Sequence, residues 1–163
     1  MTSTRPAPKP ENLLRRPAHP DISEALVHDL VFAFYDRIRA DATLGPIFDG
    51  VIGDRWDEHL AKMCDFWSSV MLASGRYEGR PLAAHLRLKG VGPEHFEIWL
   101  RLFRQTAGEV CPGDVAVIFI DRAERIAESF QLGMFFRPDS PQSFAPRSVP
   151  LPSSPATQRR DPQ

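Results

Sequence analysis

The sequence contains only two cysteines, Cys64 and Cys111, among 163 residues. Two lone thiols cannot form the disulfide framework of a small secreted protein, and they lack the CxxC spacing of a zinc site. The formal net charge is only -1, which gives no electrostatic reason to expect a nucleic-acid partner. No apolar run approaches the roughly 18 residues of a membrane span, and no secretory signal is apparent, so we expect a cytoplasmic protein without membrane contact.

Proline is concentrated at the two ends of the chain. Residues 1–20 contain five of the sixteen prolines, and residues 137–163 contain seven. Both ends offer few apolar side chains to bury, so the cost of ordering them would not be offset and we expect disordered tails. The intervening residues 21–136 are predicted to form one folded domain.

The apolar residues within 21–136 recur with helical spacing, and no segment shows a convincing strand alternation. Ser23 is placed to cap the first helix, and Gly45-Pro46 predicts a tight turn after it. Pro81 opens a segment too short to be stable as an isolated helix, which could be an irregular connection in a plain bundle or a helix with a large group packed beside it. Five helices are predicted, at about residues 23–41, 54–73, 81–89, 93–110 and 114–135.

His85 lies inside the short segment, and the residues around it leave its role open. A lone histidine among leucines is more often a core or surface residue than a ligand, and the sequence has no HExxH or paired-carboxylate motif. A haem site requires fewer sequence features, because one axial imidazole and an apolar slot suffice. The many large apolar residues could line such a slot or form a plain aromatic core. Tyr35, His59 and Trp99 add polar groups on inward faces that must find hydrogen-bond partners.

Four stretches of the domain resemble segments of the truncated haemoglobins. In chain order they are FYDRIRADATLGPIF, similar to the second helix and its turn, WDEHLAKMCDFWSSVM, similar to the distal helix, YEGRPLAAHLRL, similar to the proximal segment, and PEHFEIWLRLF, similar to the helix that follows. Their order and gaps match over about residues 23–136, and the lack of a glycine pair before the distal helix is typical of the third subgroup. The resemblance implies an all-α truncated globin, a two-over-two helical sandwich around one haem.

The resemblance also implies roles for individual residues. His85 matches the proximal ligand of the haem iron, while Tyr35, His59 and Trp99 match residues that surround the gas ligand on the distal side. Further residues are expected to line the haem pocket: Phe48, Met63, Phe66, Leu82, Leu86 and Phe96. The cofactor is expected to be haem b.

The function implied by the resemblance is binding of oxygen or another diatomic gas, such as nitric oxide or carbon monoxide, at a pentacoordinate haem iron in a polar distal pocket. Two alternatives stay open from the sequence. The same haem could turn over nitric oxide, nitrite or peroxide, with a reductase as partner. A haem-free helical module could instead bind other proteins through its proline-rich tails.

Overall fold

Six helices make up the part of the chain that the computed structural model describes, residues 16–136. They are α1 (Glu24–Ala40), α2 (Leu44–Ile52), α3 (Trp56–Leu72), α4 (Pro81–His85), α5 (Pro93–Val110) and α6 (Gly113–Phe135). No strand occurs within these described residues. None of the helices in this range is long and apolar enough to cross a membrane. The all-helical prediction is confirmed.

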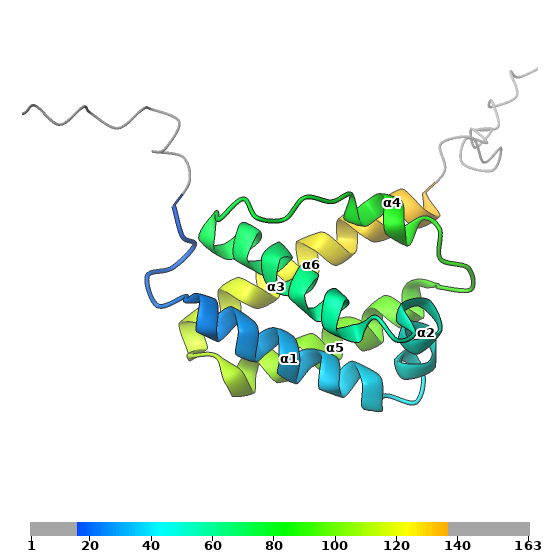
Figure 1. Cartoon of the computed structure of the whole chain (residues 1–163), viewed down its shortest axis with the longest axis horizontal. Coiled ribbons are helices and arrows are strands. Elements are labelled where there is room, and N and C mark those ends of the chain that lie inside the picture. The colour runs from blue at the N-terminus through cyan, green and yellow to red at the C-terminus, as the bar shows by residue number, and fades with distance from the viewer. Residues whose placement is uncertain (1–15, 137–163) are drawn as a thin grey trace, which may run out of the picture.

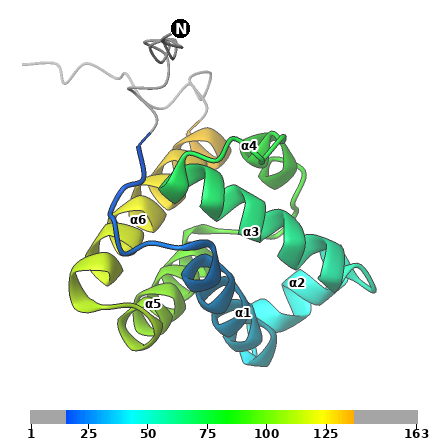
Figure 2. The same cartoon turned by 60° about the vertical axis from the view of Figure 1, so that its left-hand side comes forward.

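The four long helices form a two-over-two sandwich (Figure 1). Helix α1 packs against α3, α5 packs against α6, and the two pairs meet where α1 lies on α5. The turned view shows the same arrangement, with α1 and α5 on one side and α3 and α6 on the other (Figure 2). The short helices α2 and α4 lie toward one end of this sandwich (Figure 1).

Aromatic side chains join the two helix pairs. Phe34, Phe103 and Phe119 are fully buried at the centre of the molecule. Trp67 of α3 stacks on Phe103 with ring centroids 5.1 Å apart and also contacts Phe119 at 5.8 Å. Offset and edge-on aromatic pairs of this kind contribute roughly 0.5–1.5 kcal/mol beyond the burial of their surface. A single indole therefore links α3 to both α5 and α6.

Helix α1 follows the capping and spacing predicted for it. The Ser23 hydroxyl accepts a hydrogen bond from the Leu26 N–H at 3.1 Å, as an N-cap does. Glu24 in the first turn and arginines in the last turn suit the helix dipole. Residues spaced by three and four positions form the buried stripe: Val27, Leu30, Val31, Phe34, Tyr35 and Ile38.

The predicted tight turn around Gly45-Pro46 was wrong, because these residues lie inside α2. A carboxylate oxygen of Asp41 accepts hydrogen bonds from the N–H groups of Thr43 and Leu44, at 2.9 and 2.8 Å, and so starts the helix. Pro46 falls in the first turn, where its missing N–H removes no helical hydrogen bond. Gly45-Pro46 therefore marks the start of a helix and not a tight turn.

Gly45 gives a direct test of this packing. A Cβ atom there would lie 2.6 Å from the backbone oxygen of Arg39, which cannot rotate away. We expect Gly45→Ala to lower the free energy of unfolding by about 1–3 kcal/mol in urea titrations. The matched control is Gly50→Ala in the same helix, where an added Cβ meets nothing within 4 Å. That variant should be neutral or more stable, and equal losses in both would contradict the packing argument.

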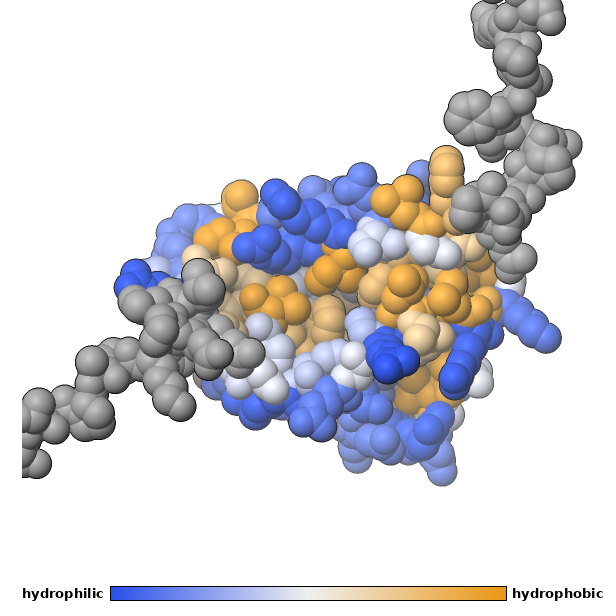
Figure 3. Space-filling model, turned by 90° about the horizontal axis from the view of Figure 1, so that it is seen from above, coloured by the Kyte–Doolittle hydropathy of each residue, from blue (hydrophilic) through white to orange (hydrophobic). Residues whose placement is uncertain are grey.

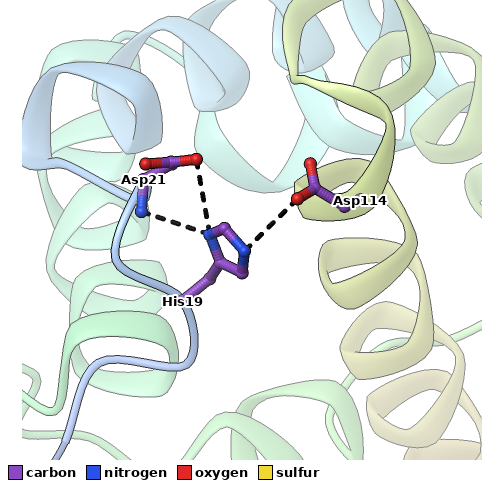
Figure 4. A group of neighbouring side chains, drawn as sticks. All are labelled: His19, Asp21 and Asp114. Atoms are coloured by element: carbon purple, nitrogen blue, oxygen red, sulfur yellow. Dashed lines mark hydrogen bonds and ion pairs between the residues drawn. The ribbon is translucent and has the colours of Figure 1, made fainter.

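The described part of the N-terminal segment lies against the domain. The Ala18 N–H donates to the Met71 carbonyl at 2.7 Å, at the end of α3. His19 Nδ1 accepts the Asp21 N–H at 3.1 Å, and its Nε2 lies 3.3 Å from Asp114 of α6 (Figure 4). An accepting Nδ1 leaves the proton of a neutral imidazole on Nε2, so the ring is bonded on both sides. Within residues 16–20, Ala18 and His19 thus make specific contacts, while the rest of both predicted tails, 1–15 and 137–163, lies outside the described residues.

Candidate functional site

A cavity of about 400 Å³ lies between α3 on one side and α4 and α6 on the other. Its volume is within the range of roughly 300–1,000 Å³ typical of small-molecule sites. All six helices contribute to its wall, which is mostly apolar. The apolar side chains of the wall include Leu44, Ile47, Phe48, Val51, Met63, Phe66, Leu88, Phe96, Ile126 and Phe130.

His85 enters this wall from α4, with its ring orientation fixed. Its Nδ1 lies 2.6 Å from the Pro81 carbonyl oxygen, one turn earlier in the same helix. A carbonyl can only accept, so Nδ1 carries the proton and Nε2 is left with a free lone pair. Phe130 of α6 packs on the ring with centroids 4.4 Å apart. This is the tautomer and support that a metal-ligating imidazole requires.

His95 lines the same cavity, but it is held in the opposite tautomer. Its Nδ1 accepts the Gly92 N–H at 2.9 Å, which caps the start of α5. The neutral His95 ring therefore carries its proton on Nε2 and presents a donor, not a lone pair. Of these two histidines, the hydrogen-bond partners favour His85 as a ligand to a metal ion.

Tyr35 and His59 form a polar pair on the other side of the cavity. Their rings meet edge to face with centroids 5.0 Å apart. Burial raises the pKa of Tyr35, whose side chain is 5% exposed, so the phenol stays protonated and can donate. Burial, with help from the charge of Lys62 and a further electrostatic contribution from His85, lowers the pKa of His59 to about 4. Both groups are thus uncharged near neutral pH.

One atom of this pair lacks a partner. Nε2 of His59 is buried and makes no hydrogen bond within residues 16–136. Leaving a buried polar group unpaired costs about 1–3 kcal/mol. A polar ligand in the cavity would satisfy this atom.

Most of the residues predicted for the site meet at the cavity. Trp99 reaches it from α5 while its ring packs on Phe34 and Phe103, at 5.3 and 5.5 Å between centroids. The wall contains eight of the ten predicted residues: Tyr35, Phe48, His59, Met63, Phe66, His85, Phe96 and Trp99.

Leu82 and Leu86 were expected on the wall, and the structure places them elsewhere. Leu86 is 54% exposed, and Leu82 points at Gly133 of α6. The reason is helical spacing: Pro81, Ala84, His85 and Leu88 share the face that lines the cavity, and Leu82 and Leu86 lie to one side of it. Closeness to His85 in the sequence therefore did not predict which residues lie on the cavity-lining face of α4.

Among the wall residues that were not predicted are two groups. Arg55 and Lys62 lie four and three positions from His59, and Glu58 lies four positions before Lys62, so helical spacing at the start of α3 could have found them. Ile126, Ala127 and Phe130 of α6 belong to a stripe whose apolar character is plain in the sequence. The sequence does not say which neighbour that stripe faces, and here no signal was missed.

The fold and the site together define a class: small all-helical proteins whose helical sandwich surrounds a cavity lined by apolar side chains and histidines, as in globins. No family model matches the chain. A curated relative, a group 3 truncated haemoglobin of Campylobacter jejuni, is 39% identical over 113 residues, which is 68% of this chain and 89% of the relative. The crystal structure of a group III truncated haemoglobin from Campylobacter jejuni matches with a TM-score of 0.69 and 36% identity, over 72% of this chain and 95% of that one.

The chain belongs to the truncated haemoglobin family, and the predictions of family and fold class are confirmed. Family membership makes it a globin-type haem protein. The residues of the cavity fit a haem: a histidine with a free Nε2 lies on one wall, an unpaired imidazole nitrogen lies on the other, and the remaining wall is mostly apolar.

Proposed function

We propose that this protein binds one haem b through Nε2 of His85 and uses it to bind oxygen or another diatomic gas reversibly at a pentacoordinate iron. The observation that carries the proposal is the hydrogen bond from His85 Nδ1–H to the Pro81 carbonyl, which leaves Nε2 free toward the cavity. A bound haem supplies an iron atom with one open position for the gas. All other steps fall to the side chains of the chain.

The polar side chains opposite His85 would select and retain the gas. Tyr35 is buried and protonated, so its hydroxyl can donate to a polar ligand. Trp99 brings an indole N–H, which can only donate. The unpaired Nε2 of His59 gains a partner when a polar ligand is present. Each such bond is worth roughly 0.5–1.5 kcal/mol, and more when the ligand carries charge.

The rim of the cavity suits the carboxylates of a haem. Arg55, the residue just before α3, and Lys62 on α3 are exposed cations that line the cavity, and neither has an ion-pair partner among the described residues. Cations at this rim would hold the propionates in solvent while the apolar ring enters the cavity. Seen from above, the molecule exposes hydrophobic residues bordered by hydrophilic ones, as a site for an amphipathic group requires (Figure 3).

The test is the optical spectrum of the reduced protein under successive atmospheres. A gas-binding protein should give one spectrum under oxygen and return to the starting spectrum when oxygen is removed, over several cycles. Rapid and irreversible oxidation to the ferric form would overturn reversible binding as the function. It would favour the alternative in which the haem turns over nitric oxide, nitrite or peroxide with a reductase. The cytoplasmic location stays a prediction from the sequence.

A further inference from the structure

The helix that carries His85 cannot fix its own position. Helix α4 has five residues, no side-chain cap and no buried residue. A helix of this length is far below the length that is stable alone in water. The position of His85 therefore depends on the element against which α4 lies. That element is α6, and both cartoon views show α4 beside its C-terminal end (Figures 1 and 2).

Two contacts fix α4 on α6. The ring of His85 packs on Phe130, with centroids 4.4 Å apart and planes inclined by 38°. The side chain of Leu82 lies on Gly133. Leu82 and His85 are three residues apart on α4, and their partners Gly133 and Phe130 are three residues apart on α6, so the two segments pack in opposite chain directions. Moving one contact therefore moves the other through the intervening turn of α4.

Gly133 makes the second contact possible because it has no side chain. A Cβ atom there would lie 2.8 and 3.0 Å from the two methyl carbons of Leu82 and 3.4 Å from its Cγ. The backbone of Gly133 gives no other reason for glycine, since it is not among the residues with positive φ. A glycine inside a helix costs about 1 kcal/mol relative to alanine. Glycine at this position therefore allows the Leu82 side chain to lie close to the backbone of α6.

Rotation about the Cβ–Cγ bond of Leu82 alone does not relieve such a clash. Because both methyl carbons already lie within 3.0 Å of the added atom, rotation about the Cβ–Cγ bond replaces one short contact by another. Relief requires either a rotation of Leu82 about its Cα–Cβ bond, which moves the side chain off α6, or a shift of α4. Either change removes the contact of Leu82 with the backbone of α6. With no buried residue, α4 is the part that is held most weakly.

We propose that Gly133 is a positioning residue for His85. By letting Leu82 lie on the backbone of α6, it sets the depth of α4 and hence how Nε2 of His85 faces the cavity. The inference rests on the proposed function, in which His85 is the iron ligand, and it adds a residue on another helix that tunes this ligand without touching it.

The test is the iron–histidine stretching band in resonance Raman spectra of the reduced, gas-free protein. Gly133→Ala should shift this band from its wild-type frequency and speed haem loss by about ten-fold, the change that corresponds to 1.4 kcal/mol. The matched control is Gly108→Ala inside α5, where an added Cβ meets nothing within 4 Å. It should leave the band and haem loss unchanged.

Two further variants separate positioning from a general loss of stability. Leu82→Ala with Gly133 retained removes the same contact without adding atoms, so it should also shift the band even if Gly133→Ala folds poorly. Combining Leu82→Ala with Gly133→Ala removes the clash and refills the gap, so the band should return toward the wild-type frequency. A lower melting temperature with an unshifted band in both single variants would overturn the inference.

The same spectra distinguish this failure from failure of the proposed function. If wild-type protein shows an iron–histidine band that His85→Gly abolishes, His85 is the ligand and only the role of Gly133 is in question. If the band is absent from wild type, or survives in His85→Gly, the proposed function itself fails.

Discussion

His85→Ala is expected to lose most of its haem during mild purification. The substitution removes the free Nε2 that the hydrogen bond to the Pro81 carbonyl directs to the cavity. Loss of an outer partner of a metal ligand already costs roughly 10–100-fold in affinity, and loss of the ligand itself should exceed that. The measurement is the haem content per chain of the purified variant, together with the rate of haem transfer to an excess of a haem-free acceptor globin.

His95→Ala is the matched control for this prediction. It removes another imidazole from the same cavity, but one whose Nδ1 accepts the Gly92 N–H and whose Nε2 is protonated. We expect it to loosen the start of α5 while leaving haem bound. If His85→Ala keeps one haem per chain with a normal reduced spectrum, the assignment of His85 is wrong and His95 becomes the candidate ligand.

Tyr35→Phe is expected to speed oxygen release by about ten-fold or more, while carbon monoxide release changes far less. Bound oxygen is the more polar of the two gases, so it gains more from the buried phenol donor. Phenylalanine keeps the ring contacts with His59 and Phe48 and removes only the hydroxyl. The free energy of unfolding should therefore change by no more than roughly 1–2 kcal/mol. Stopped-flow ligand replacement measures both release rates.

The chain offers Tyr77→Phe as a matched control, because Tyr77 is its second tyrosine and also lines the cavity. It lies in the loop before α4 and packs on Phe66, so its effect on oxygen release should be small.

Trp99→Phe should act in the same direction as Tyr35→Phe, and the double variant should be non-additive because both donors serve one acceptor. Changes in both gases that agree within about two-fold would show that Tyr35 is only a core residue.

Helix content and most of the candidate site could be predicted from the sequence because local signals carry them. Ser23 caps α1 as its side chain suggests, and Pro93 and Pro112 mark the start of α5 and α6. The roles of the site residues on α1, α3 and α5 were implied by the resemblance to truncated haemoglobins, and the stripes on these long helices indicated only that they face inward. In these helices the spacing of the stripe determines the face.

The failures arose where a local signal was ambiguous or the partner was distant. Gly45-Pro46 is compatible with a turn or a helix start, and the side chain of Asp41 decides for the helix. Leu82 and Leu86 lie beside the cavity face of a helix too short to show its period. The contribution of Phe130 depends on how α6 crosses α4, which no pattern within either segment specifies.

A titration of haem-free protein with haem, followed by the Soret absorption band of bound haem, tests whether the chain holds one haem through His85. We expect a sharp end point at one haem per chain for wild type and for His95→Ala, and no sharp end point for His85→Ala. A wild-type titration without saturation would overturn haem binding and leave the haem-free helical module as the better description.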